Sequence, residues 1–344
     1  MIITIKKIAQ LAAVSEGTVD RIIHNRGQVT QENIDKVNAI IKEYGYKKNI
    51  FASNLAFNKK FKFAVFLPKN EGLEYWEIPI NGIERAEDEF EKFGVTLDYY
   101  FYKYNSNSFK KIASKLLEQK YDGILFAPIF HDESILFLNQ CKKKNIPVVM
   151  IDSNIKEVDS FAYIGQDAFQ SGYLAGRLVC YNSTLENNVL IIKITREIES
   201  TSVYLQRIKG FYSFFEDHKE FANFKFSEIR LKDSGQKQLN VKMFEGINTI
   251  FIPNSRSYIV AKFLNKNKLN HIKLVGYDLL QENVKYLKDG VIDFLINQKP
   301  EQQGYLGVEY LYKKIILKEN VENTYYMPLE IIIKENFSNS HENI

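Results

Sequence analysis

Apolar strand segments alternate with amphipathic helical segments from residue 61 onward, in two successive series. The first series runs from Phe61–Leu67 to Phe161–Gly165, and the second runs from Asn188–Ile194 to Asp293–Gln298. Strands that are apolar throughout are typical of parallel sheets covered by helices on both faces. Such sheets bind ligands at the carboxyl ends of their strands, so two sheets in succession predict two α/β lobes with a small-molecule cleft between them. We place the other strands at 95–102, 122–128, 146–152, 248–253 and 272–278, and helices at 79–93, 108–118, 132–144 and 168–181.

The first 46 residues follow a different pattern, that of three short amphipathic helices. One helix covers Ile5–Leu11, a second begins after Ser15, and a third begins at Thr30 and ends at Gly45. Serine is favoured just before a helix and glycine just after one. Two short helices joined by a tight turn form a helix-turn-helix, which presents its second helix to the DNA major groove. We therefore expect a small all-α head that binds double-stranded DNA.

The positive charge of the chain is concentrated in this amino-terminal segment. Residues 1–60 contain ten Lys and Arg against five Asp and Glu, which gives +5, whereas the whole chain has a net charge of +4. The remainder is therefore −1. A basic segment of this size favours binding to phosphates, and the nearly neutral remainder does not.

Several classes of protein are made unlikely by what the sequence lacks. Two cysteines, Cys141 and Cys180, are too few for a disulfide framework, and we expect both to be reduced. The sequence has no signal-peptide pattern and no apolar run long enough to span a membrane, so we expect a cytoplasmic protein without a membrane partner. It has no glycine-rich phosphate loop, His-Glu-x-x-His or Cys-x-x-Cys motif. We therefore expect no enzyme activity, no catalytic residue, no cofactor and no metal site.

The motifs of the head and of the longer segment occur in a specific order. The head contains Thr4-Ile5-Lys6-Lys7-Ile8-Ala9, Val14-Ser15, Thr18-Val19, Arg21 and Tyr44-Gly45-Tyr46, and the longer segment contains Ile146–Asp152, Ile164–Asp167, Arg207–Phe211, Val275–Asp278 and Ile296–Pro300. In order and spacing these motifs resemble the lactose-repressor (LacI/GalR) family. Its sensor domains share the type I periplasmic sugar-binding fold.

The resemblance implies roles for residues of the head. Its second helix would read base edges, and Arg21 matches a position that contacts guanine; the alternatives are a phosphate contact or a salt bridge with Glu16 or Asp20. Leu55, in Ala52–Leu55, matches a hinge-helix leucine that wedges into the minor groove, unless it packs on the sensor domain instead. The operator sequence cannot be transferred from a relative, because Glu16 and Gly17 occupy the positions that most often select it. The implied DNA-binding residues are Thr4, Ser15, Glu16, Gly17, Thr18, Arg21, Asn25 and Leu55.

The resemblance also implies a carbohydrate site in the cleft. Polar side chains at or just after strand ends would hold hydroxyls, since carboxylates and amides form two hydrogen bonds in a plane. Leu205 occupies the position of an arginine that usually clamps the ligand, and Arg196 is our candidate substitute. Because this arginine is missing, a nucleobase or another non-sugar metabolite stays an alternative ligand. The implied ligand-binding residues are Tyr75, Trp76, Asp152, Arg196, Asn254, Asp278 and Gln298, although several of them could instead order their own loops, cap a helix or pack a lobe.

These observations predict a regulator with three parts. We expect a head at 1–46, a hinge at 47–60 and a sensor domain at 61–344, with lobe 1 at 61–165 and 299–324 and lobe 2 at 166–298 and 325–336. The expected function is transcriptional regulation in which a small effector, expected to be a sugar, controls operator affinity in a homodimer. The competing hypothesis of a solute-binding protein does not explain the basic head.

Overall fold

The computed structural model describes residues 3–23, 27, 29–45, 59–70, 74–158, 162–195, 202–232 and 238–337. They fall into two compact units, Met1–Lys59 and Lys60–Ile344. Residues 47–58 of the expected hinge, including Leu55, lie outside the described residues, as do Asn25 and Arg196.

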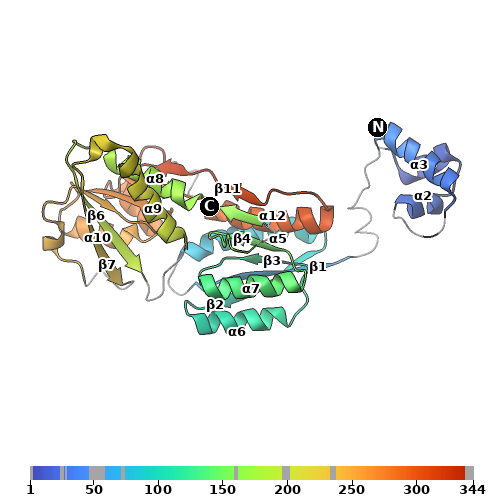
Figure 1. Cartoon of the computed structure of the whole chain (residues 1–344), viewed down its shortest axis with the longest axis horizontal. Coiled ribbons are helices and arrows are strands. Elements are labelled where there is room, and N and C mark those ends of the chain that lie inside the picture. Colours follow the sequence, from blue (N-terminus) through green and yellow to red (C-terminus); the bar gives the residue numbers. More distant parts are fainter. Residues whose placement is uncertain are drawn as a thin grey trace. The chain divides into compact units, whose positions relative to one another are not determined.

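Three short helices form the head: α1 (Ile5–Ala12), α2 (Glu16–Ile23) and α3 (Gln31–Tyr44). Ile8, Val19 and Val37 are fully buried where the three helices meet (Figure 1). Helix α3 ends at Gly45, whose φ of 61° is the left-handed conformation that glycine adopts easily. The expected helix-turn-helix is therefore present, with α1 and α2 as its two helices.

The beginning of α2 depends on Ser15, whose Oγ accepts a hydrogen bond from the Thr18 backbone N–H at 3.1 Å. Replacing Ser15 with alanine should destabilise the head by about 1 kcal/mol, because that N–H loses its partner. Thr30→Ala is the matched control, since Thr30 precedes α3 without a side-chain capping bond. Amide hydrogen exchange in α1 and α2 would measure both variants. Equal effects of the two substitutions would contradict this role of Ser15.

Lobe 1 of the sensor domain is built on a parallel sheet with strand order β11-β5-β4-β3-β1-β2. Helices α6 and α7 lie together on one face, and α5 and α12 pack on each other at the other face (Figure 1). The strands are β1 (Phe61–Pro68), β2 (Val95–Tyr102), β3 (Gly123–Phe126), β4 (Val148–Ile151), β5 (Ala162–Gly165) and β11 (Thr324–Tyr326), and the helices are η1 (Glu74–Trp76), α5 (Glu77–Glu91), α6 (Ser106–Leu117), α7 (His131–Lys143), α12 (Pro300–Tyr312) and its continuation η5 (Lys313–Leu317).

Lobe 2 repeats this architecture with strand order β12-β10-β9-β8-β6-β7. The chain passes between the two sheets after β5, after β10 and between β11 and β12, so three connections join the lobes. The strands are β6 (Asn188–Thr195), β7 (Lys225–Lys232), β8 (Thr249–Phe251), β9 (Lys273–Tyr277), β10 (Phe294–Asn297) and β12 (Glu330–Ile332), and the main helices are α8 (Ala168–Cys180), α9 (Ser202–Asp217), α10 (Ser257–Lys266) and α11 (Gln281–Lys288).

The structure corrects the sequence-based fold in three details. Strand β12 pairs antiparallel with β10, so the second sheet is not wholly parallel as expected. Strand β11 extends the first sheet to Tyr326, two residues beyond the expected lobe boundary. Strand β7 has no counterpart among the expected strands, because it is an edge strand whose residues are mostly exposed and polar. Apolar patterning identifies central strands, and it fails where a strand has few neighbours.

Candidate functional site

The outer face of α2 carries the side chains expected to meet DNA. Ser15, Glu16, Gly17 and Arg21 are exposed, whereas Val19 on the opposite face is fully buried. No acidic side chain in the described part of the chain forms an ion pair with Arg21. The guanidinium is therefore available to a partner outside the head.

Three of the implied side chains in the head also have structural roles. Thr4 Oγ1 accepts a bond from the Lys7 N–H at 3.3 Å at the start of α1. The Ser15 and Thr18 hydroxyls lie 2.9 Å apart at the start of α2. All three hydroxyls stand at helix starts, where N–H groups and the helix dipole favour a phosphate.

Between the lobes, two carboxylates follow corresponding strands of the two sheets. Asp152 follows β4 of lobe 1 and Asp278 follows β9 of lobe 2, and both have left-handed backbone conformations, with φ of 65° and 66°. Non-glycine residues rarely adopt this conformation, and it is found preferentially at functional sites. Asp278 is fully buried and Asp152 is partly buried.

The protein satisfies part of the hydrogen-bonding capacity of each carboxylate. Tyr75 donates its hydroxyl to Asp152 Oδ1 at 2.6 Å, and Ser153 donates to Oδ2 at 3.0 Å. Ser255 donates to Asp278 Oδ2 at 2.7 Å, and the Gln298 amide donates to Oδ1 at 3.0 Å. Each carboxylate oxygen can accept a second bond, so both groups retain unused acceptor capacity.

Glutamines connect these two halves of the site. Gln303, on α12, accepts from the Asp152 N–H at 2.9 Å and donates to the Gln298 carbonyl at 2.9 Å. Gln166, just after β5, donates its amide to Gln298 Oε1. The residues around Asp152 and Asp278 therefore form one hydrogen-bonded network that includes two of the three connections between the lobes.

Arg207 supplies the positive charge of this network. It lies on α9, is only 5% exposed, and places its guanidinium 3.8 Å from the centre of the Tyr277 ring. One of its terminal nitrogens donates to the Pro253 carbonyl at 2.9 Å, while Nε has no hydrogen-bond partner among the described residues. Burial raises the pKa of both Asp152 and Asp278, and the field of Arg207 opposes that rise. The guanidinium therefore stabilises two carboxylates that burial disfavours.

Close packing of two helices fixes the backbone beneath Arg207. A Cβ added to Gly172 of α8 would lie 1.9 Å from the Arg207 carbonyl oxygen, and a Cβ added to Gly210 of α9 would lie 1.9 Å from the Phe169 carbonyl oxygen. The two helices can approach this closely only because both positions are glycine. Their contact therefore holds Arg207 in place.

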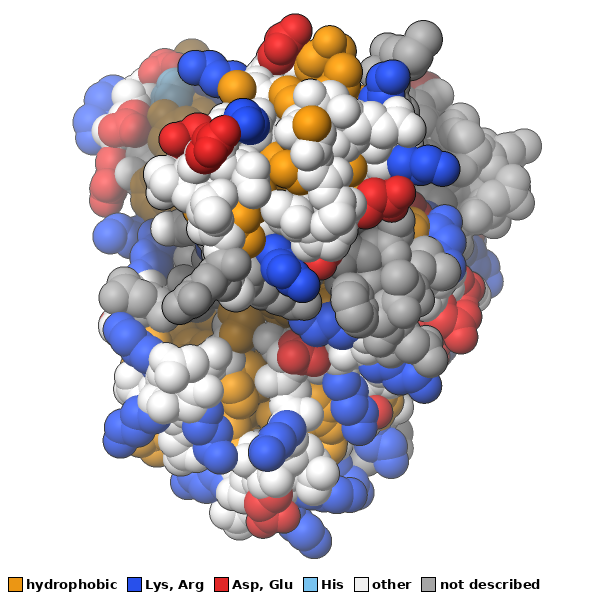
Figure 2. All heavy atoms as spheres, turned by 90° about the vertical axis from the view of Figure 1, so that its right-hand side faces the viewer, with side chains coloured by type: hydrophobic (Ala, Val, Ile, Leu, Met, Phe, Trp, Pro, Cys, Tyr) orange, Lys and Arg blue, Asp and Glu red, His pale blue; other side chains and the backbone are white. Residues whose placement is uncertain are grey.

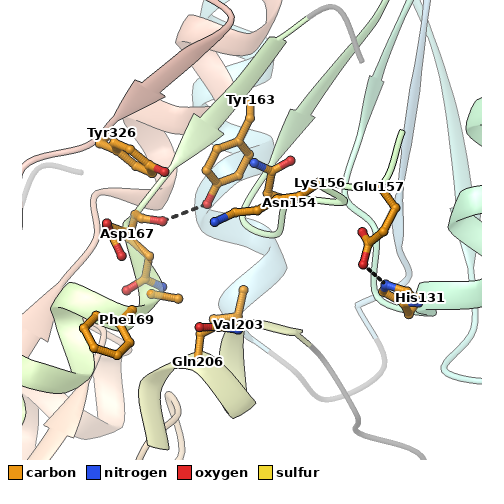
Figure 3. Close-up of a pocket in the computed structure, with 12 residues that line it drawn as sticks. His131, Asn154, Lys156, Glu157, Tyr163, Asp167, Phe169, Val203, Gln206 and Tyr326 are labelled. Carbon is orange, nitrogen blue, oxygen red and sulfur yellow. Dashed lines mark hydrogen bonds and ion pairs between the residues drawn. The ribbon is translucent and has the colours of Figure 1, made fainter. Parts of the chain in front are cut away.

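A pocket of about 160 Å³ lies beside the network and is lined by both lobes (Figure 3). Gln166 is shared by the pocket and the network, and its buried Oε1 has no hydrogen-bond partner in the described part of the chain. At its edge, His131 Nε2 lies 3.1 Å from Glu157 Oε1, and bonds to Asp132 and Glu157 raise the pKa of His131. The pocket is smaller than the roughly 300–1,000 Å³ that is usual for drug-sized ligands, so only a small ligand fits it as it stands.

The implied ligand residues fall into two groups in the structure. Tyr75, Asp152, Asp278 and Gln298 meet in the network described above. Trp76 is instead packed in lobe 1, 3% exposed, with its indole N–H directed at the Tyr104 hydroxyl and its ring against the edge of Tyr75. Asn254 binds backbone of its own lobe, donating to the Ile194 carbonyl at 2.6 Å and accepting from the Arg256 N–H at 3.2 Å. The contacts of Trp76 agree with the lobe-packing alternative. The alternative for Asn254 was a helix cap, and its side chain accepts from the Arg256 N–H just before α10, which begins at Ser257.

Sequence reasoning missed the role of Arg207, together with Tyr163, Gln166, Ser255 and Gln303. A signal for Arg207 was nevertheless present, because Tyr204, Arg207, Phe211 and Phe214 form a buried stripe at helical spacing. A charge in such a stripe needs a partner inside the protein. Asp167, in contrast, caps α8 by accepting from the Gln170 N–H at 3.0 Å.

Neither a metal centre nor a membrane segment is found in the described residues. They contain no group of three or more His, Cys, Asp or Glu side chains arranged to hold a metal ion. None of their helices is both long enough and apolar enough to cross a bilayer.

Comparisons with known proteins agree with the two-unit architecture. Residues 63–319 match the model of the periplasmic binding protein domain, and residues 4–49 match that of bacterial regulatory proteins, lacI family. The chain is 26% identical to the sucrose operon repressor of Streptococcus mutans, over 92% of this chain and 93% of that protein. It is 24% identical to the HTH-type transcriptional repressor PurR of Proteus mirabilis, over 93% of each. A crystal structure from Bacteroides fragilis, described as a LacI transcriptional regulator, is 30% identical and superimposes with a TM-score of 0.73, covering 81% of this chain and 98% of that one.

Proposed function

Because the chain belongs to the LacI family of bacterial regulatory proteins, it is a DNA-binding transcriptional regulator controlled by a small ligand, and we propose that this ligand is an uncharged carbohydrate. The observation that carries the proposal is the network of Asp152, Asp278 and Arg207 between the lobes. The name of the sucrose operon repressor, similar along nearly the whole chain, supports the same ligand class.

The arrangement of acceptors suits a molecule with several hydroxyl groups. Asp152 and Asp278 each offer carboxylate oxygens, the buried Gln166 Oε1 offers another acceptor, and Arg207 Nε offers a donor. Leaving such groups unpaired inside the protein costs about 1–3 kcal/mol each. A polyol recovers this energy, because each of its hydroxyls both donates and accepts.

The charge of the network argues against an anionic ligand. Its described members contain two carboxylates and one guanidinium, so with both acids ionised the site carries one excess negative charge. A sugar phosphate or a uronic acid would place a like charge beside buried carboxylates, and such juxtaposition costs several kcal/mol. Leu205, half-exposed on α9, adds no compensating charge.

A ligand that contacts both lobes explains how the signal reaches DNA. Asp152 belongs to lobe 1 and Asp278 to lobe 2, so a sugar bound to both carboxylates favours the arrangement in which the lobes are closed on it. A ligand shifts an equilibrium only by its difference in affinity for the two states. We propose that this shift changes the operator affinity of a homodimer acting in the cytoplasm, and that the site binds its ligand without catalysing a reaction.

The regulatory part of the proposal is tested with DNA selected by the full chain from random sequences. Operator affinity is then measured with and without neutral mono- and disaccharides. We expect at least one neutral sugar to change the affinity by about 5–150-fold, the usual range for coupling between two sites. DNA binding that no neutral sugar alters would contradict the proposed ligand class and leave the DNA-binding function intact.

For the head, we propose that Arg21 contacts a guanine in the operator. Arg21→Ala should then weaken binding to the selected duplex by about 1–3 kcal/mol and remove the preference for one G·C pair. Lys36→Ala is the control, because Lys36 is paired with Glu32 at 2.7 Å on α3. Competition assays with every single-base variant of the duplex measure both effects. An equal loss on all duplexes would identify Arg21 as a phosphate contact instead.

A further inference from the structure

The end of lobe 1 where its strands begin carries an excess of lysines, and Figure 2 shows blue side chains outnumbering red ones in the lower part of the view. We call this end the basic end of lobe 1 and define it by the segments that precede β1, β2, β3, β4 and β11. These segments are 59–60, 92–94, 118–122, 144–147 and 318–323, and they contain six lysines and four acids. Lys115, Lys142 and Lys143 add to them in the last turns of α6 and α7.

Lobe 2 provides an internal comparison for this charge. Its corresponding segments, 181–187, 218–224, 245–248, 267–272 and 289–293, contain two lysines and five acids. Lysines are favoured at the carboxyl ends of helices, where they interact with the helix dipole. The last helical turns of lobe 2 also carry basic residues, Arg177, Lys266, Lys285 and Lys288, so the difference between the lobes lies in the segments that precede their strands.

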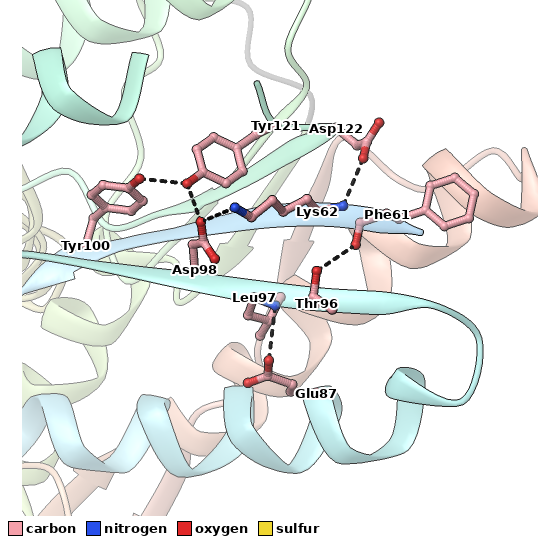
Figure 4. Close-up of polar contacts among 9 residues, drawn as sticks. All are labelled: Phe61, Lys62, Glu87, Thr96, Leu97, Asp98, Tyr100, Tyr121 and Asp122. Atoms are coloured by element: carbon pink, nitrogen blue, oxygen red, sulfur yellow. Dashed lines mark hydrogen bonds and ion pairs between the residues drawn. The ribbon is translucent and has the colours of Figure 1, made fainter. Parts of the chain in front are cut away.

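Two acids near the basic end, Asp98 and Asp122, are engaged within the protein (Figure 4), whereas Glu118, Glu319 and Glu322 are exposed. Asp122 accepts from the Lys62 N–H at 2.9 Å, and Asp98 is paired with Lys62 Nζ at 2.6 Å and accepts from the Tyr121 hydroxyl at 2.6 Å. Lys120, Lys143 and Lys144 are exposed and form no ion pair with any described acidic side chain. Their field is therefore directed at solvent or at a partner.

The chain itself connects this end to the DNA-binding head. Strand β1 begins here at Phe61, and the head ends at Gly45, so fifteen residues separate the two. A segment of that length spans at most roughly 50 Å, at about 3.3–3.6 Å per residue. DNA held by the head is consequently kept at high local concentration near these lysines.

We propose that the basic end of lobe 1 is a second DNA contact, in which Lys120, Lys143 and Lys144 bind backbone phosphates flanking the operator. Such contacts are independent of sequence and release counterions from the duplex. They add affinity for long duplexes and place the sensor domain against the DNA. The inference rests on the DNA-binding function of the chain, and failure of that function would appear as loss of wild-type binding.

The test compares two triple variants of the full chain. Lys120, Lys143 and Lys144 are changed to Gln in one, and the control carries the same change at Lys242, Lys262 and Lys266, which are exposed on lobe 2. Affinity is measured against salt concentration for a short duplex covering only the selected operator and for a long duplex extending beyond it. An unchanged thermal midpoint establishes that each variant is folded.

We expect the first variant to lower the salt slope on the long duplex by about 2–3, because each lost phosphate contact removes about 0.9 from it. The control and the short duplex should show no change. Equal salt slopes for wild type and the first variant on the long duplex would overturn the proposal, and would direct attention to an acidic protein as the partner of these lysines.

Discussion

Replacing Arg207 with methionine should lower the free energy of unfolding of the sensor domain by about 3–5 kcal/mol, the usual cost of leaving a buried charge uncompensated. Methionine retains much of the side-chain volume, so the loss is mainly electrostatic. Asp152 and Asp278 would remain buried without the guanidinium that now opposes the rise of their pKa. Urea denaturation measures the change through Trp76, the single tryptophan of the chain, which is buried in lobe 1.

Two further variants separate this electrostatic effect from simple packing. Arg177→Met removes an exposed arginine from α8, which lies over the Phe214 ring at 4.9 Å, and should cost less than about 1 kcal/mol. Combining Arg207→Met with Asp278→Asn should recover part of the loss, since one uncompensated charge is removed. A loss below about 1 kcal/mol in Arg207→Met would mean that the network is not an electrostatic unit.

The pH dependence of Arg207→Met follows from the direction of the pKa shifts. Burial raises the pKa of Asp152 and Asp278 above their values in the unfolded chain, so the folded state holds their protons more tightly. The cost of burying these two ionised carboxylates is fully present above their folded pKa values, and it is lost as the pH falls through those values and the carboxylates take up protons. Arg207 opposes this rise of the pKa, so the pKa values should rise further when it is removed. The difference in the free energy of unfolding between the variant and the wild type should therefore become smaller in acid.

Asp278→Asn should weaken effector binding by about 10–150-fold, since a hydrogen bond to a charged group contributes about 1.5–3 kcal/mol. The substitution keeps the size of the side chain and removes the negative charge, which we propose accepts a hydrogen bond from a sugar hydroxyl. Asp293→Asn is the matched control, because Asp293 is an exposed carboxylate of the same lobe that accepts from the Leu274 N–H at 2.8 Å, at the opposite edge of the sheet. Calorimetric titration with the sugar that alters operator binding measures both. Equal affinities of the Asp278 variant and the wild type would show that this carboxylate does not bind the effector.

Binding should also depend on pH through the same carboxylate. Hydroxyl donors stabilise the ionised form, so effector binding lowers the raised pKa values of Asp152 and Asp278 and releases protons. Affinity should therefore fall as the pH is lowered into that range, and Asp278→Asn should show a weaker dependence. Titrations in buffers with different ionisation enthalpies detect the released protons.

The sequence predicted those parts of the molecule that depend on local pattern. Strand β2 was predicted at its observed bounds, 95–102, because amphipathic helical segments, 79–93 and 108–118, flank it on both sides. Asp152, Asp278 and Gln298 were implied by the family resemblance, and the structure places each of them just after the carboxyl end of a strand. Gly45 was identified as a helix end because its conformation suits glycine.

The remaining parts depend on contacts between distant segments. Arg207 lies on a helix that packs against Gly172 and not at the end of a strand, so the strand pattern could not identify it. Gln166 and Gln303 matter because three chain connections bring the lobes together, which only the fold reveals. Trp76 resembles a stacking platform by position, yet the contacts with Tyr104 and Tyr75 bury it in lobe 1.

The most direct test of the account is a thermal-shift screen of the full chain and Asp278→Asn against neutral sugars, sugar phosphates, uronic acids and nucleobases. At about 100 times its dissociation constant, a ligand stabilises the folded state by roughly 2.7 kcal/mol. The account predicts that a neutral sugar raises the unfolding temperature of the sensor domain and that Asp278→Asn loses most of this increase. Stabilisation by sugar phosphates, uronic acids or nucleobases, with none from any neutral sugar, would contradict it.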